Sequence, residues 1–311
     1  MTEISIGIDI SKDHLDAYRS HDGAEKRFTN DRSGCRRPVA WIGAEAERIV
    51  YEPTGRYHRL VEDILSKAGL PLAKVNPRQA KRFTEAIGVL AKSDRVDARV
   101  LAQMGRVLDL PCHQSASAEM DALKELCVMR RALLKDRTAA KNREKGARLP
   151  LIKRQLAARL RHIDRQVTAI DAAIRERIKA DAALTERFDI LVSIPGISEI
   201  TAAVLLVEMP ELGTLDGKQV ASLAGLAPVS RQSGKWQGKA FIRGGRRGPR
   251  EALYMPALVA MRFNPDLKRM YEALRARGKP PKVAITAVMR KRVIIANALL
   301  RDHRPWAPHL A

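Results

Sequence analysis

The chain opens with a strict alternation of apolar and polar side chains. Isoleucine occupies every second position from residue 4 to residue 10, which is the period of a strand with one buried face. Asp9 therefore lies on the face opposite the isoleucines. Two further strands, expected at about 13–20 and 25–30, flank the turn signal His21-Asp22-Gly23, which predicts a hairpin.

After these strands the pattern changes repeatedly between strand spacing and helical spacing. We expect a strand near 48–52 that ends at Pro53, a helix over 57–67, a short strand over 72–75 and a helix over 93–108. Three strands in a meander followed by alternating helix and strand is the order of an RNase H-like mixed sheet. Periodicity by itself establishes only an α/β class.

From about residue 117 to residue 180 helical spacing takes over completely. Between 152 and 178 apolar side chains recur at intervals of three or four residues, which is typical of a long helix with a coiled-coil-like seam. Pro150 predicts a break between this helix and a more highly charged one over 117–147. The pattern predicts a helical hairpin and leaves open whether the seam packs within the chain or against a second copy.

The C-terminal third is mostly helical apart from one basic stretch. Residues 188–209 form two helical segments joined by Pro195-Gly196, which fits either a plain αα-turn or a helix-hairpin-helix that holds a phosphate through its loop amides. Residues 224–255 are instead rich in glycine and basic residues, with no acidic residue over 231–250.

These patterns predict an α/β plus α chain with three domains. We expect an RNase H-like catalytic domain over 1–112, a helical hairpin or coiled coil over 113–183 and a mostly helical C-terminal domain over 184–311.

Composition narrows the class of partner. The 311 residues carry a formal charge of +22, which favours a polyanion such as nucleic acid, because phosphate neutralisation by Lys and Arg supplies most non-specific affinity. No apolar run long enough to span a membrane is present, so a membrane partner is not expected. Three cysteines, Cys35, Cys112 and Cys127, show no metal-ligand spacing. With no signal peptide visible, we interpret them as buried reduced thiols of a cytoplasmic protein.

Four acidic residues stand where a metal-dependent nuclease needs them. Asp9 lies within the first strand, Glu52 ends a later strand, and Asp94 and Asp97 share one helical face. Magnesium prefers hard oxygen ligands, and two such ions about 4 Å apart can hold the attacking and leaving oxygens of a phosphoryl displacement. Each acid alone could be an ordinary surface residue; Asp94 and Asp97, for example, could simply offset neighbouring arginines. Together they indicate metal-dependent phosphodiester chemistry.

Short motifs along nearly the whole chain resemble a known family. The segments GIDISK (7–12), YEPTG (51–55), VNP (75–77) and KSDRVDARVLA (92–102) resemble the N-terminal part of the DEDD transposases of the insertion-sequence one-ten family. The segments IPGIS (194–198), LAGLAP (223–228), QSG (232–234) and IRGGRRGPREALY (242–254) resemble the C-terminal transposase domain of that family. Each motif is weak alone, but their order and combination are specific.

The resemblance implies a function that composition could not reveal. Members of this family are recombinases that excise and insert a mobile element, with an N-terminal domain like the Holliday-junction resolvase version of the RNase H fold. The resemblance implies that the four acids bind Mg²⁺, with Mn²⁺ as a substitute. It also implies a structured bridge RNA that pairs with donor and target DNA. It further implies dimers that pair into tetramers, with the acids and the serine of one site coming from different subunits. We expect the protein to be cytoplasmic and associated with the nucleoid of a prokaryotic cell.

Ser233 of the QSG motif matches the family's nucleophile, and Ser230 is its rival. A serine hydroxyl needs activation, and attack on DNA would leave a phosphoserine link that preserves the bond energy for rejoining. Both serines could also be ordinary loop residues. The nucleic-acid-binding residues that we expect around them are Arg231, Lys235, Lys239, Arg243, Arg246, Arg247 and Arg250.

Two other functions stay open from the sequence. An RNase H-like nuclease or junction resolvase that uses water would need the acids but not Ser233. A non-enzymatic nucleic-acid binder would leave the four acids without a role.

Overall fold

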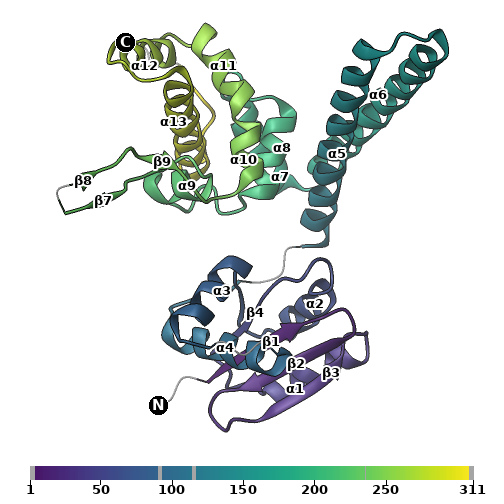
Figure 1. Ribbon diagram of the computed structural model, residues 1–311, viewed down its shortest axis with the longest axis vertical. Coiled ribbons are helices and arrows are strands. Elements are labelled where there is room, and N and C mark those ends of the chain that lie inside the picture. Colours follow the sequence, from purple (N-terminus) through teal and green to yellow (C-terminus); the bar gives the residue numbers. More distant parts are fainter. Residues whose placement is uncertain (1–3, 90–92, 114–116, 235, 308–311) are drawn as a thin grey trace. The chain divides into compact units, whose positions relative to one another are not determined.

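The computed structural model describes residues 4–89, 93–113, 117–234 and 236–307. They form two compact units, Met1–Ala116 and Ser117–Ala311. The first unit is built around a sheet, and the second is almost entirely helical (Figure 1).

The first unit contains a mixed five-stranded sheet. Its strands are β1 (Ser5–Ile10), β2 (His14–Arg19), β3 (Glu25–Thr29), β4 (Arg48–Tyr51) and β5 (Leu72–Lys74). They lie in the order β3-β2-β1-β4-β5. The first three strands are antiparallel neighbours, whereas β4 pairs in parallel with β1 and β5 in parallel with β4. This is the strand order expected for an RNase H-like mixed sheet.

Helices cover both faces of this sheet. They are the short 3₁₀ helix η1 (Gly34–Arg36), α1 (Arg37–Ile42), α2 (Arg59–Lys67), α3 (Pro77–Ala86) and α4 (Asp94–Val107). The isoleucines of β1 point into a core shared with η1, α1 and α2, and a second core on the other face joins β4 and β5 to α3 and α4. The alternation in β1 thus separates an apolar face from a face that receives α4.

Helix α4 lies unusually close to β1 because two glycines remove the side chains between them. A Cβ atom at Gly7 would collide with the backbone carbonyl of Ala98, and one at Gly105 would collide with the Ser5 hydroxyl and lie 2.7 Å from Val50 Cγ2. Neither glycine has a positive φ, so the requirement is for space and not for backbone freedom. The backbone contact places the first turn of α4 over the polar face of β1.

The second unit begins with two long helices. These are α5 (Ala118–Gly146) and α6 (Pro150–Lys179), which pack together as the expected hairpin. Near its base Ile174 and Ile178 are buried in one cluster with α5, α7 and α8. Leu149, Leu151 and Ile152, near the turn of the hairpin, are exposed. The lower half of the seam therefore packs within the chain, and pairing of the hairpin with a second copy stays a prediction.

The rest of the second unit, as far as the structure describes it, is mostly helical. Its helices are α7 (Ala182–Ser193), α8 (Glu199–Glu208), α9 (Gly217–Leu223), α10 (Arg247–Ala252), α11 (Tyr254–Phe263), α12 (Pro265–Ala276) and α13 (Pro281–Arg301). Pro195-Gly196 joins α7 to α8 as expected, and the buried guanidinium of Arg292 donates a 2.8 Å hydrogen bond to the Pro195 carbonyl. Phosphate binding by this turn stays a prediction.

A two-stranded ribbon projects from these helices (Figure 1). It consists of β6 (Pro228–Val229), β7 (Gln232–Ser233), β8 (Trp236–Gln237) and β9 (Phe241–Ile242). β6 pairs with β9 and β7 pairs with β8, both antiparallel. The sequence predicts no strands here, because strands of two residues are too short to show an alternating period.

The described helices contain none that is long and apolar enough to cross a membrane. The expectation of three buried thiols is wrong for Cys112, which is exposed, whereas Cys35 and Cys127 are buried. Burial raises the pKa of each of these two thiols to about 11, so neither is a reactive thiolate at neutral pH.

We expect Gly7→Ala to destabilise the first unit by about 1–3 kcal/mol, because the new methyl group meets backbone atoms that cannot rotate away. Gly146→Ala, at a helix position with open space around it, is the matched control and should not lower stability. Urea unfolding followed by circular dichroism measures both; equal stability of the two variants would contradict the close-packing account.

Candidate functional site

A row of charged residues crosses the sheet at the end of β1. Asp9 pairs in register with Asp16 of β2, and Asp16 pairs with Arg27 of β3. On the other side of β1 the last parallel pair is Ile8 with Tyr51. Asp9 and Glu52 each come one residue after this pair. Because β4 ends at Tyr51, Glu52 stands just beyond the paired part of its strand.

Helix α4 adds the other two predicted acids above this row. Ser93 caps the helix by accepting a hydrogen bond from the Val96 amide. This cap fixes Asp94 at the first helical position, and Asp97 follows one turn later. Ala98, the next residue, is the one whose carbonyl lies against Gly7. The contact between Ala98 and Gly7 therefore holds the first turn of α4, which contains both acids, over β1.

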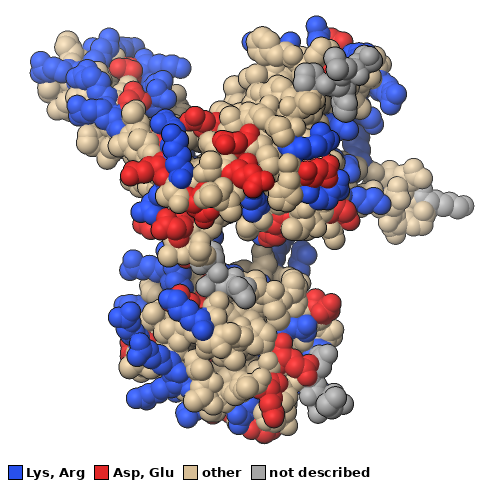
Figure 2. Space-filling model, turned by 180° about the vertical axis from the view of Figure 1, so that it is seen from behind, with Lys and Arg blue, Asp and Glu red and all other residues tan. Residues whose placement is uncertain are grey.

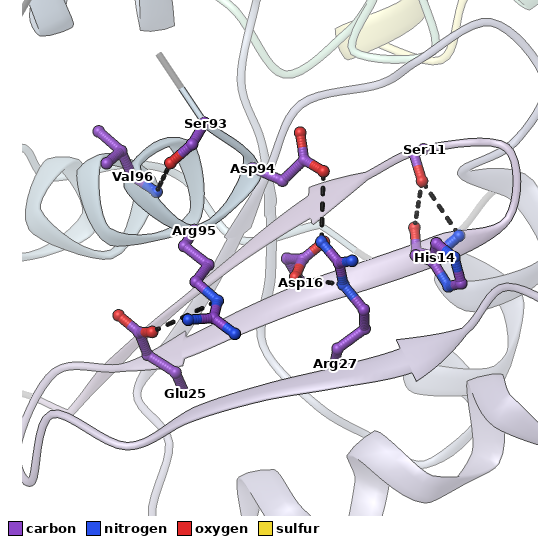
Figure 3. Close-up of polar contacts among 9 residues, drawn as sticks. All are labelled: Ser11, His14, Asp16, Glu25, Arg27, Ser93, Asp94, Arg95 and Val96. Carbon is purple, nitrogen blue, oxygen red and sulfur yellow. Dashed lines mark hydrogen bonds and ion pairs between the residues drawn. The ribbon is translucent and has the colours of Figure 1, made fainter. Parts of the chain in front are cut away.

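Arg27 links the sheet to α4 (Figure 3). Its Nε and Nη2 atoms donate to both carboxylate oxygens of buried Asp16 at 2.9 and 3.0 Å, and Nη2 lies 3.4 Å from an Asp94 oxygen. The arginines next to Asp94 and Asp97 in the sequence have an acidic partner on the sheet. Arg95 and Arg99 form ion pairs with Glu25 of β3.

The carboxylates around Asp9 change its protonation. Burial, and then the negative charges of Asp97, Asp94 and Asp16, raise the pKa of Asp9 to about 6, against a smaller opposing effect of the Ile10 amide. Like charges at short range favour the neutral acid. Asp9, Asp94 and Asp97 therefore form one electrostatically coupled group.

The chemistry of these carboxylates suits a bound cation, but their present positions do not form a complete binding site. The donors are hard carboxylate oxygens, the ligands that divalent ions such as Mg²⁺ prefer, and a cation would relieve the repulsion that raises the pKa of Asp9. As the side chains lie, the described residues contain no group of three His, Cys, Asp or Glu close enough to hold one ion. Side-chain rotation of exposed Asp94, away from Arg27, would be part of forming such a site.

Asp16 and Arg27 lie beside these acids, although no sequence motif marked them. Asp16 is 5% exposed and directly opposite Asp9. A register counted from the His21-Asp22-Gly23 turn places Asp16 beside Arg27, whereas its pairing with Asp9 follows from the turn between β1 and β2. Its strand carries no other sign that distinguishes a functional acid from a surface one.

The predicted serine lies in the other unit, near the end of the ribbon. Ser233 ends β7 and is exposed, and its partner across the ribbon is Trp236. Gly234, with φ of +54°, begins the connecting turn, where a glycine avoids the strain of a left-handed backbone. Ser230 lies between β6 and β7 and is also exposed.

The seven predicted nucleic-acid-binding residues separate into two groups. Arg246 is bound by both oxygens of Glu211 at 2.6 Å, and Arg250 donates to the carbonyls of Gly225 and Gly244. These two side chains hold the base of the ribbon to the helices.

The other members of the set are exposed. Arg247 pairs with Glu251 on the surface of α10. Arg231, Lys239 and Arg243 are exposed, with no acidic partner in ion-pair range within the described ranges. Lys235 lies outside the described residues. The side chains available to a phosphate are therefore mainly those of the ribbon itself.

Basic residues also gather on the α5–α6 hairpin. Figure 2 shows Lys and Arg side chains densely covering the hairpin on the face drawn, with few acidic ones between them. This arrangement provides an extended positive surface, which suits a nucleic-acid backbone.

Family comparisons agree with the motifs in both units. Residues 6–147 match the DEDD IS110 family, described as "Transposase". Residues 188–272 match the family described as "Transposase IS116/IS110/IS902 family". IS110 is the insertion-sequence one-ten family whose motifs the sequence resembles.

Individual relatives extend this similarity over the full chain. The pilin gene-inverting protein of Moraxella bovis is 30% identical over 321 residues, covering 98% of this chain and 98% of that protein. The 43.6 kDa protein of insertion element IS110 from Streptomyces coelicolor is 34% identical over 157 residues, covering 50% of this chain and 38% of that protein.

Among solved structures, Thermus thermophilus RuvC in complex with a Holliday junction covers 36% of this chain and 99% of its own, with 13% identity and a TM-score of 0.27. At this TM-score the fold assignment depends on the strand order and not on the neighbour. The two family matches and the full-length relatives confirm the resemblance to transposases, which are enzymes that cut DNA. The chain belongs to the IS110/IS116/IS902 family of transposases.

Proposed function

We propose that this protein excises and inserts a mobile element by metal-assisted attack of Ser233 on DNA phosphodiesters, guided by a structured RNA. The observation that carries the proposal is the coupled carboxylate group formed by Asp9, Asp94 and Asp97. Burial, together with repulsion from Asp97 and Asp94, raises the pKa of Asp9 to about 6, and a bound cation would offset the repulsion. A relative over 98% of the chain is named for inverting a pilin gene, which supports a recombining activity.

The acids would hold the divalent ion, Mg²⁺ or Mn²⁺ in its place. Asp9, Glu52, Asp94 and Asp97 are the proposed ligands, and the ion would supply charge stabilisation at the scissile phosphate. Asp16 is held by Arg27 and acts on Asp9 through its charge. Arg27 pairs with both Asp16 and Asp94. Its positive charge would partly neutralise these acids in the absence of the ion.

Ser233 would form the covalent link to DNA. Its Oγ–H loses its proton as Oγ bonds to phosphorus, and the bond from phosphorus to one deoxyribose oxygen breaks as that oxygen gains a proton. The phosphodiester is thereby exchanged for a phosphoserine ester, and the reverse attack by a DNA hydroxyl rejoins the strand without ATP. Arg231, Lys239 and Arg243 would neutralise the phosphates on either side.

The proposed partners are donor and target DNA and the structured RNA that selects them. Basic surfaces on the α5–α6 hairpin and the ribbon suit both kinds of backbone. Because the acids and Ser233 belong to different compact units, assembly of a complete site from two copies, in a dimer or tetramer, is compatible with the chain.

We expect Ser233→Ala to abolish recombination and the covalent protein–DNA adduct seen on a denaturing gel, because the variant lacks the hydroxyl proposed to form the phosphoester. Ser230→Ala is the matched control, an exposed serine of the same segment, and should retain both. An adduct that survives in Ser233→Ala, or is lost in Ser230→Ala, would contradict the assignment. Cleavage without any adduct in the wild type would favour a nuclease that uses water.

The raised pKa of Asp9 predicts a pH-dependent stability in metal-free protein. Because the folded-state pKa exceeds the unfolded value of 3.8, wild type should lose stability relative to Asp9→Asn as pH rises from about 4 to about 7, by up to about 3 kcal/mol. Thermal unfolding of both proteins across this range measures the difference.

Added Mg²⁺ should restore wild-type stability above pH 6 and leave Asp9→Asn much less affected. Asp9→Asn should also lose DNA cleavage at every pH. A stability difference that does not change with pH, or cleavage retained by the variant, would remove Asp9 from the proposed site.

A further inference from the structure

The ribbon exposes an aromatic side chain next to the proposed nucleophile. Trp236 is 58% exposed, although Trp is among the residues that gain most from burial. The chain has only three tryptophans, and this one faces Ser233 across the β7–β8 pair. Its position is not explained by any core of the second unit.

The register places three functional groups on one face of the ribbon. Ser233 and Trp236 are direct cross-strand partners, whose side chains lie on the same face about 5 Å apart at Cβ. The next bonded position joins the Gly238 amide to the Arg231 carbonyl at 2.8 Å. Arg231 is two residues from Ser233, so it shares that face. A hydroxyl, an indole and a guanidinium are therefore presented together.

Gly238 gives the indole a defined resting place. A Cβ atom at this position would clash with the six-membered ring of Trp236, so the ring lies over the glycine backbone. Gly238 has no positive φ, which means that the glycine is required by the ring and not by the turn. One side of the indole is thus supported by the ribbon, and the exposed remainder is available to a flat partner.

We propose that Trp236 stacks on an unpaired DNA base next to the phosphate attacked by Ser233. Stacking on aromatic side chains is the usual way in which proteins hold single-stranded nucleic acid, and it needs neighbouring cations for the backbone. Arg231, Lys239 and Arg243 are exposed on the same ribbon, and no acidic residue occurs over 231–250. A protein partner docked on the indole would bury part of this uncompensated charge, whereas a nucleotide neutralises it.

The proposed stacking would fix the register of the scissile phosphate. A base held on the indole restrains its own backbone phosphate, and Ser233 is the cross-strand partner of the residue that holds it. The inference rests on the proposed function in naming Ser233 as the nucleophile. Base stacking itself is a binding property, so it can be measured without the chemical step.

Fluorescence anisotropy of full-length protein on two DNA probes tests the proposal. One probe is a mixed-sequence duplex with a central unpaired bubble, and the other is the fully paired duplex. Trp236→Ala should bind the bubble about 5- to 100-fold more weakly and the paired duplex less than about twofold more weakly. Trp236→Phe should retain most of the affinity, and Trp236→Leu, which is apolar but cannot stack, should not.

Two further variants separate stacking from general contact. Phe241→Ala removes an aromatic residue of equal exposure, 58%, from the base of the ribbon, and should leave bubble binding within about twofold of wild type. Gly238→Ala keeps the indole but displaces it, and should weaken bubble binding in the same direction as Trp236→Ala.

Several outcomes would overturn the proposal. Equal losses on bubble and duplex, full rescue by Trp236→Leu, or an equal loss in Phe241→Ala would each exclude a stacked base. A change in oligomeric mass of DNA-free Trp236→Ala, measured by light scattering, together with unchanged bubble binding would instead assign the indole to a protein interface. Failure of the nucleophile assignment shows separately, as the absence of a covalent adduct in wild type.

Discussion

The close contact of α4 with β1 is the constraint on which the acid site depends. Gly7 and Gly105 remove the side chains that would separate the two elements, so the helix backbone rests directly on the strand. A normal helix–sheet separation would lift Asp94 and Asp97 away from Asp9. On the other face of the sheet, the side chains of β1 pack into an aliphatic core, which holds the strand in place beneath α4.

The same contact creates an electrostatic cost. Burial, together with the negative charges of Asp97 and Asp94 on α4, raises the pKa of Asp9 to about 6. Arg27 offsets part of the charge by holding Asp16 and reaching Asp94. Destabilised charge groups of this kind are typical of sites that bind a counter-charge during function. The packing of the sheet and its two cores compensates for the free energy lost by placing these charges close together.

The second unit divides its basic residues between structure and recognition. Arg246, with Glu211, fixes the base of the ribbon, while Arg231 and Lys239 remain available along its length. A base held to the helices and an exposed, positively charged end suit the roles proposed for Ser233 and Trp236. The indole of Trp236 and the hydroxyl of Ser233 owe their common face to strand register alone.

The sequence by itself determined the class of the elements outside the ribbon and predicted the four acids. Alternation placed Asp9 opposite the isoleucines, and helical spacing placed Asp94 and Asp97 on one face, because these periods are local properties of the backbone. Only the tertiary structure decided that Asp16 and Arg27 join them, since cross-strand register and helix packing connect residues far apart in the chain. The tertiary structure also determined the ribbon. Its two-residue strands form by pairing with each other and are too short to show an alternating pattern in the sequence.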